Sequence, residues 1–215
     1  MKEKKKRSLG RPRLSEKSKP TNEVILHAAI QLFLSEGFKN VSLDDVAKRC
    51  NVTKATIYYY FESKAALFTE AMTHLMTQIR EYMLQMLLEP EPLRERLHRV
   101  TEAHLRATFD IDLDGFLREA KSSLSEKQLQ AMQHAESKMF DALENAFTDA
   151  MNNKEIPEIN AKFAVHSYMS LLKVGNYRNP DQTRLFPTIE ETALKIMDLF
   201  WNGLFPYSGE TGKPS

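Results

Sequence analysis

The chain has 215 residues and a mass of 24.8 kDa, enough for one large domain or for a small module joined to a larger one. Hydrophobic residues make up 42% of it, with few Gly and Pro and one cysteine, which excludes collagen-like, low-complexity and disulfide-rich classes and favours a helix-rich globular protein. The net charge of +1 is segregated, because residues 1–64 hold 14 Lys and Arg against 7 Asp and Glu (net +7) and residues 65–215 hold 16 against 22 (net −6).

A basic front on an acidic body is typical of a nucleic-acid module attached to a domain that does not bind nucleic acid. A basic tail that is merely solvated is the alternative. Residues 1–20 lack apolar periodicity, so we expect a flexible basic arm there. Thr21 is suited to cap a first helix, in which apolar residues repeat at helical spacing until Gly37.

A helix-turn-helix is predicted next. Ser42 and Asp45 have the spacing of a capping box, which begins a short helix, and Asn51 tolerates the left-handed backbone of a tight turn. Thr53 is suited to cap the following helix, which runs to Phe61. Two short helices joined by about three residues match the helix-turn-helix motif.

The remaining segments are also helical. Ser63 is suited to cap a long helix that keeps the 3.6-residue period up to Pro90. Further helices are predicted near 92–109 and 112–122, from the capping box Ser125-x-x-Gln128 to about 152, over 158–174, and from Thr188-x-x-Glu191 to Asn202, which Gly203 ends. We therefore predict an all-α fold whose first three helices form a helix-turn-helix domain beside a larger helical domain. The expected parts are a flexible arm (1–20), the helix-turn-helix domain (21–66), the helical body (67–205) and a disordered tail (206–215).

The segment 54–60 contains three consecutive tyrosines, and their positions on a helix indicate their role. At 100° per residue, Lys54, Ala55, Tyr58 and Tyr59 fall within an arc of about 140°, while Ile57 and Phe61 lie together outside that arc. An open face with lysine and tyrosine but no acid suits the major groove of DNA. The predicted DNA contacts on the two helices are Ser42, Thr53, Lys54, Ala55, Thr56, Tyr58, Tyr59 and Tyr60, with Lys64 binding phosphate at the start of the next helix. Tyrosines that wedge the small domain against the body are the alternative.

The stretch LFLSEGFKNVSLDDVAKRCNVTKATIYYYFESKAALF, from Leu32 to Phe68, resembles the DNA-binding domain of TetR-family transcriptional regulators. It carries the F-x-x-x-G-[FY] end of the first helix, the T/S-x-x-x-[IV]-A second helix, and the I-Y-x-[HY]-F recognition helix with x-[SN]-K behind it. The segment GRPR is similar to the arm that many members carry in front of the first helix, and its Arg11 and Arg13 are predicted to contact DNA. Ala55 departs from the glycine that is frequent in the family.

The resemblance implies that the body is a regulatory domain that holds an effector pocket and dimerises through its last two helices. Side chains that are apolar and adaptable enough to line such a pocket are Met72, Met76, Met83, Phe109, Phe116, Met132, Met139 and Phe140, although ordinary core packing is the more frequent role of such residues. The last two helices are apolar on more than one side, so a second copy of the chain is expected to cover the surplus. The residues assigned to that interface are Tyr168, Met169, Leu172, Ile196 and Phe200.

The predicted function is a homodimeric repressor that leaves a palindromic operator in double-stranded DNA when a small, apolar or amphipathic effector binds. An architectural DNA-binding protein, or one that responds to no ligand, is the alternative. No phosphate-cradling glycine loop, nucleophile elbow or metal-ligand spacing is present, so no enzyme, cofactor or metal is predicted. Because there is neither a secretory leader nor a membrane span, a cytoplasmic location is expected.

Overall fold

The computed structural model describes residues 20–108, 113–181 and 183–205, and the regular secondary structure within them is helical apart from one bridge between Arg178 and Arg184. The helices are α1 (Thr21–Glu36), α2 (Leu43–Cys50), α3 (Lys54–Tyr60), α4 (Lys64–Leu87), α5 (Leu93–Ala107), α6 (Leu113–Lys121), α7 (Glu126–Asn152), α8 (Ala161–Gly175) and α9 (Ile189–Leu204). The predicted all-α fold class is confirmed. The predicted arm, except Pro20, and the predicted tail lie outside the described residues.

Side-chain caps start most of these helices where the sequence predicts. Ser42, Thr53, Ser63, Ser125 and Thr188 each accept a hydrogen bond from the amide three residues on. These bonds satisfy amides that have no partner within the helix.

Three predicted boundaries are wrong. Thr21 is the first residue of α1 and not its cap, since Pro20 precedes the helix without a side-chain cap bond. Helix α8 begins at Ala161 and not at residue 158, because the Oδ1 of Asn160 accepts the amide hydrogen of Phe163 (2.9 Å) and caps it there. Gly203 does not end α9, which continues to Leu204.

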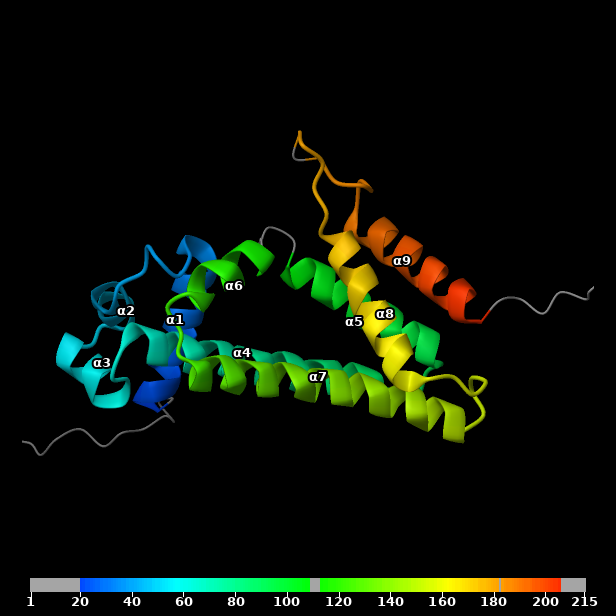
Figure 1. Ribbon diagram of the computed structural model, residues 1–215, viewed down its shortest axis with the longest axis horizontal. Helices are drawn as coiled ribbons and strands as arrows, with labels where there is room; N and C mark the ends of the chain where they lie inside the picture. Colours follow the sequence, from blue (N-terminus) through cyan, green and yellow to red (C-terminus); the bar gives the residue numbers. More distant parts are fainter. Residues whose placement is uncertain (1–19, 109–112, 182, 206–215) are drawn as a thin grey trace, which may run out of the picture.

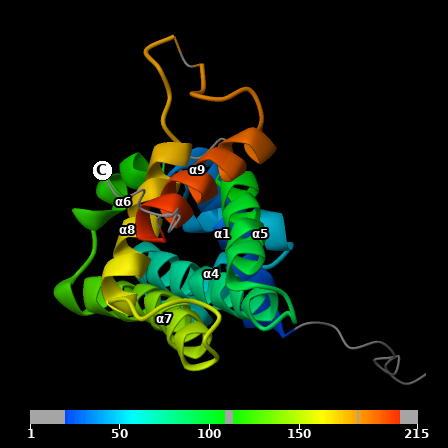
Figure 2. The same ribbon diagram turned by 90° about the vertical axis from the view of Figure 1, so that its right-hand side faces the viewer.

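The helices form two groups joined by a long pair (Figure 1). Helices α1, α2 and α3 lie at one end of the molecule, and α5, α8 and α9 lie toward the other. Helix α4 leaves the first group and runs side by side with α7 along the length of the molecule. Seen from the end, α9 crosses α5 and α8, against both of which it packs (Figure 2).

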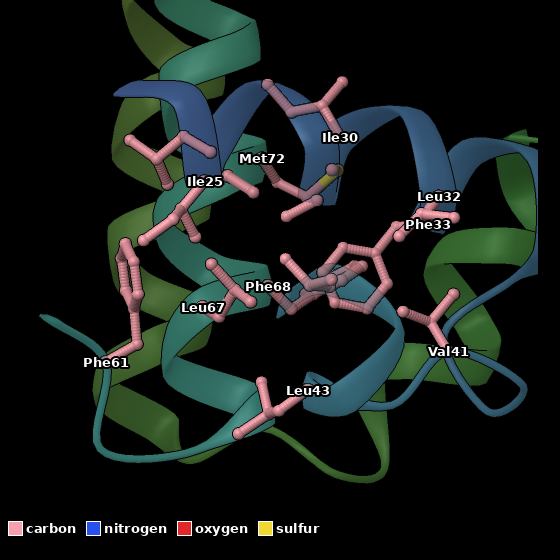
Figure 3. Close-up of a cluster of buried hydrophobic side chains, with 14 of the residues drawn as sticks. Ile25, Ile30, Leu32, Phe33, Val41, Leu43, Phe61, Leu67, Phe68 and Met72 are labelled. Carbon is pink, nitrogen blue, oxygen red and sulfur yellow. The ribbon is translucent and has the colours of Figure 1, made fainter. Parts of the chain in front are cut away.

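An aromatic cluster holds the first group to the rest. Figure 3 shows Phe33 of α1 and Phe68 of α4 pointing toward one another, and their rings meet edge to face with centroids 5.1 Å apart. The ring of Phe38 lies 5.0 Å from that of Phe68, and Phe116 of α6 lies 5.5 Å from it. Since Ala120 and Met132 are buried in the same cluster, the helix-turn-helix end and the body share one core.

The second core lies between α4, α5, α7, α8 and α9. Its largest side chain, Tyr168, is fully buried, and its hydroxyl pairs with that of Thr101 (2.9 Å) and donates to the carbonyl of Leu97 (3.3 Å). Burial raises the pKa of the Tyr168 phenol. The hydrogen bonds let a polar atom sit in an apolar core without the cost of lost hydration.

The aromatic cluster generates a stability prediction. Phe68→Ala should lower the free energy of unfolding by about 3–5 kcal/mol, because the cavity would open between α1, α4 and α6. Leu88→Ala, at a side chain that is 79% exposed, is the control and should change it by less than about 0.5 kcal/mol. Urea denaturation followed by circular dichroism measures both, and similar values for the two variants would contradict the role given to Phe68.

Candidate nucleic-acid interface

The turn between α2 and α3 fixes how α3 is presented. Asn51 has φ 55° and ψ 43°, the left-handed conformation predicted for it, and the amide of Val52 donates to the carbonyl of Ala47 (3.0 Å). The hydroxyl of Thr53 then accepts from the amide of Thr56 (3.1 Å), which starts α3. The two helices therefore form the helix-turn-helix that the sequence predicts.

Only one side of α3 is buried. Ile57 is completely buried in the first core, and Phe61, which follows the helix, is 2% exposed. The tyrosines face outward, with exposed fractions of 50% for Tyr58, 81% for Tyr59 and 42% for Tyr60. Because these rings are open to solvent, they do not wedge the small domain against the body, and the packing alternative does not describe them. Tyr60 stacks edge to face on Tyr59, with centroids 4.9 Å apart.

Lys54 does not stand alone on this surface. Its Nζ lies 2.9 Å from Oδ2 of Asp44 on α2, and both side chains are about half exposed. The hydrogen bond to Asp44 raises the pKa of the Lys54 ammonium. The sequence analysis did not select Asp44. It lies ten positions from Lys54, and no sequence pattern shows that α2 and α3 bring the two residues together.

The predicted hydroxyl contacts are already engaged within the chain. Ser42 completes a capping box with Asp45, whose pKa its hydrogen bonds lower. The hydroxyls of Thr53 and Thr56 lie 2.9 Å apart. The Ser42 hydroxyl donates its one hydrogen to Oδ2 of Asp45, and one threonine hydroxyl donates to the other, so one hydroxyl hydrogen of the three is left for a phosphate oxygen. Ala55 is exposed between them and leaves room for close approach.

Lys64 has a different environment from the one predicted. Its Nζ donates to the carbonyl of Lys39 (3.1 Å) and lies over the ring of Phe38, 4.6 Å from the centroid. Burial lowers the pKa of its ammonium, while the carboxylates of Glu119 and Asp45 oppose that shift. The lysine is therefore a brace between α4 and the α1–α2 turn, and a phosphate would have to displace an internal partner.

Three basic side chains of the module were missed as candidates. Lys39, Lys48 and Arg49 are exposed, and Arg49 bonds the amide oxygen of Gln31 (3.3 Å). Charge gives no signal for them, because residues 21–64 hold 5 Lys and Arg against 5 Asp and Glu, and the excess of positive charge in residues 1–64 lies in residues 1–20. Arg11 and Arg13 of the predicted arm lie outside the described residues.

The residues predicted to line an effector pocket do not face one cavity. Met72 and Met132 are buried in the first core, against which Met76 and Phe116 pack, whereas Met83 is buried in the second core beside Met139 and Phe140. Phe109 lies outside the described residues. A hollow of about 240 Å³ between α4 and α7 is lined by none of them, but by Thr73, Thr77, Arg80, Ala131, His134, Ala135 and Lys138. The grouping into one pocket is corrected, because these side chains fill two packed cores.

The residues assigned to a dimer interface also need correction. Tyr168, Leu172, Ile196 and Phe200 are at most 5% exposed within a single chain, so they form its own core and are closed to a second copy. Met169 is partly buried against the same core. The exposed apolar side chains on α8 and α9 are instead Phe163, Val174, Leu194 and Leu199, with exposed fractions of 63%, 50%, 46% and 65%. Sequence periodicity alone did not distinguish the inner face from the outer one.

Neither a metal site nor a membrane-crossing segment is found in the described part of the chain. No group of three or more His, Cys, Asp and Glu side chains is arranged there to hold an ion. No helix there is both long and apolar enough to cross a bilayer. Cys50 is half-buried, and burial raises the pKa of its thiol.

The helix-turn-helix matches the model of a known protein family. The family model described as "Bacterial regulatory proteins, tetR family" matches residues 25–71, from the first turns of α1 into α4. The uncharacterized HTH-type transcriptional regulator YhgD of Bacillus subtilis (strain 168) is 27% identical over 184 residues, 83% of this chain and 93% of that protein. IcaR of Staphylococcus aureus (strain Newman), an HTH-type negative transcriptional regulator of the biofilm operon icaADBC, is 40% identical over 48 residues, 22% of this chain and 26% of that protein.

Among solved structures, the transcriptional regulator FadR from Bacillus subtilis in complex with stearoyl-CoA has a similar fold. The TM-score is 0.68 at 19% identity, over 84% of this chain and 98% of that one. The relatives are transcriptional regulators, which agrees with the expectation that this chain is not an enzyme.

The left-handed turn residue generates a prediction. Asn51→Val should lower the free energy of unfolding by about 1–2 kcal/mol, because a branched side chain does not tolerate φ 55°, whereas Asn51→Gly should be nearly neutral. The control is Asn145, which is exposed inside α7, where glycine should be the worse of the two substitutions. Urea denaturation measures all four variants, and the same order at both positions would contradict the prediction.

Proposed function

We propose that this chain, whose residues 25–71 match the model of the tetR family of bacterial regulatory proteins, is a homodimeric repressor that binds a palindromic operator through α3 and releases it when an effector binds. The observation that carries the proposal is the open face of α3. A helix whose inward residue Ile57 is completely buried presents a lysine and three exposed tyrosines, the most exposed of them at 81%, in a chain whose first 20 residues hold 9 Lys and Arg against 2 Asp and Glu.

The chemistry of this face fits base and phosphate contacts. Lys54 supplies a donor for the acceptors of guanine, and Ala55 can approach a thymine methyl group. The phenolic hydroxyls of Tyr58, Tyr59 and Tyr60 supply neutral hydrogen bonds to phosphates. One of the hydroxyls of Thr53 and Thr56 can add another, whereas Ser42 would first have to release Asp45. The exposed Lys39, Lys48 and Arg49 add the sequence-independent attraction.

A second copy of the chain is proposed to cover the outer faces of α8 and α9. Phe163, Leu194 and Leu199 leave an apolar surface there that the chain does not cover itself. A two-fold pairing of α8 and α9 would bury this surface in both copies and set two α3 helices on successive turns of the duplex. This pairing uses the neighbours of the buried residues that the sequence analysis selected.

Repression and the effector rest on relatives. IcaR, which shares 40% identity over 48 residues, is a negative regulator, and we propose the same direction of control here. The similarly folded FadR structure holds stearoyl-CoA, which has an acyl chain and a charged head. An amphipathic effector of this kind is therefore proposed to bind the helical body and to favour a conformation with lower DNA affinity. A regulator of this class acts where the genomic DNA is, so we place it in the cytoplasm.

The experiment that tests the function is selection of bound sequences from a random DNA library, with the region upstream of the chain's own gene included. Enrichment of a palindrome with a two-fold footprint supports the repressor. Equal retention of all sequences with a steep salt dependence would instead identify an architectural DNA-binding protein. Repeating the binding assay with stearoyl-CoA present tests whether an amphipathic thioester releases the selected DNA.

Two substitutions on α3 test which residues read the sequence. Lys54→Ala and Tyr59→Ala should each weaken binding of the selected sequence by about 1–3 kcal/mol and relax the choice of bases. Lys127→Ala on α7 and Tyr82→Ala on α4 remove the same side chains at exposed sites on the body and should leave the affinity unchanged. Fluorescence anisotropy measures each affinity. Equal losses on selected and random DNA would count against base reading by α3.

The interface proposal is tested at α9. Leu199→Glu should raise the dimer dissociation constant roughly 100-fold or more, because each copy would bury a carboxylate without a partner. Leu88→Glu places the same charge on a more exposed leucine, at the end of α4, and should not affect assembly. Sedimentation equilibrium measures the constants, and an unchanged dimer in the Leu199→Glu variant would exclude this surface.

A further inference from the structure

A hydrogen bond joins the body directly to the turn that leads into the helix-turn-helix. The amide of Lys39, between α1 and α2, donates to Oε1 of Glu119 on α6 at 2.7 Å, although the two residues are 80 positions apart. The same carboxylate lies beside Gly37, where an added Cβ would be 3.4 Å from its Oε2. Gly37 has φ 83°, a positive value that glycine adopts at little cost. With this turn, the amide of Lys39 is directed toward α6.

Lys39 is held from both sides of its backbone. Its amide hydrogen bonds Glu119, and its carbonyl accepts from Nζ of Lys64, the first residue of α4. Two residues later Val41 is buried, and Ser42 then caps α2. Since α2 packs on α3, the place of Lys39 fixes where the α2–α3 pair begins.

Apolar contacts bring α6 to this position but do not define it alone. Phe116 packs its ring against Phe68, and Ala120 is fully buried in the first core. Such contacts are not directional, whereas a hydrogen bond to a carboxylate fixes both distance and angle. Glu119 lies between these two apolar residues and supplies the directional contact.

We propose that Glu119 is a positioning residue for DNA binding, which sets the orientation of the α2–α3 pair on the body by holding the Lys39 amide. The inference rests on the proposed function. It adds a residue far from α3 to those that determine which DNA sequence the protein binds. A dimeric reader needs both α3 helices at a fixed spacing, so a loosened turn lowers selective binding more than binding to random DNA. A displacement of α6 would release the same contact.

Two conservative substitutions separate the hydrogen bond from the charge. Glu119→Asp keeps the charge but is one methylene shorter, so it should lose the Lys39 amide. Glu119→Gln loses the charge but keeps an oxygen at the same reach. The matched controls are Glu70→Asp and Glu70→Gln, at an exposed glutamate of α4. In the free protein, amide hydrogen exchange at Lys39 should speed up about tenfold or more in Glu119→Asp and stay near the wild-type rate in Glu119→Gln.

The second measurement is affinity for the selected sequence and for random DNA. Glu119→Asp should weaken the selected complex about 10- to 100-fold and leave random DNA unchanged, while Glu119→Gln should keep the selected complex within about threefold. The inference is overturned if exchange at Lys39 does not change in Glu119→Asp, if selected and random DNA lose affinity equally, or if Glu119→Gln loses as much as Glu119→Asp. If the wild-type chain selects no sequence, the proposed function fails and the positioning role fails with it, whereas normal selection in Glu119→Asp removes the positioning role alone.

Discussion

The packing of Phe68 is the contact on which the rest of the arrangement depends. Its ring meets Phe33 of α1, Phe38 of the following turn and Phe116 of α6, with centroid distances from 5.0 to 5.5 Å. Because Phe68 lies in the second turn of α4, the helix that continues into the body also completes the core of the small module. The module is too small to bury a sufficient core by itself, so this sharing supplies stability and fixes orientation together.

The shared core also explains why α3 can be so exposed. A seven-residue helix is marginal in isolation, and α3 is held by its Thr53 cap and by the burial of Ile57, with Phe61 directly after it. Its buried apolar contacts lie on one side, so the other side is free for tyrosines that would be unfavourable to expose for stability alone. The exposed rings are then a feature that stability does not require, which is why they point to function.

The sequence predicted the fold class, the caps and the left-handed turn because these follow from local chemistry. Ser42, Asn51, Thr53 and Ser125 act through backbone groups at most four residues away. It could not predict which apolar face of α8 or α9 points inward, since both faces carry apolar residues and only the packing of α5 against α9 buries Ile196 and exposes Leu199. The contacts of Lys64 with Lys39 and of Glu119 with Lys39 span 25 and 80 positions, and no local pattern encodes them.

The two lysines of the interface differ in how readily they can change partners. The Lys54 ion pair with Asp44 is exposed, so water and salt already screen it and a base or phosphate can replace the carboxylate at little cost. Lys64 is partly desolvated over Phe38 and bonded to a backbone carbonyl that would lose its partner if the lysine turned away. The exposed Lys54 is therefore suited to reading DNA, and the half-buried Lys64 to holding the frame from which α3 is presented.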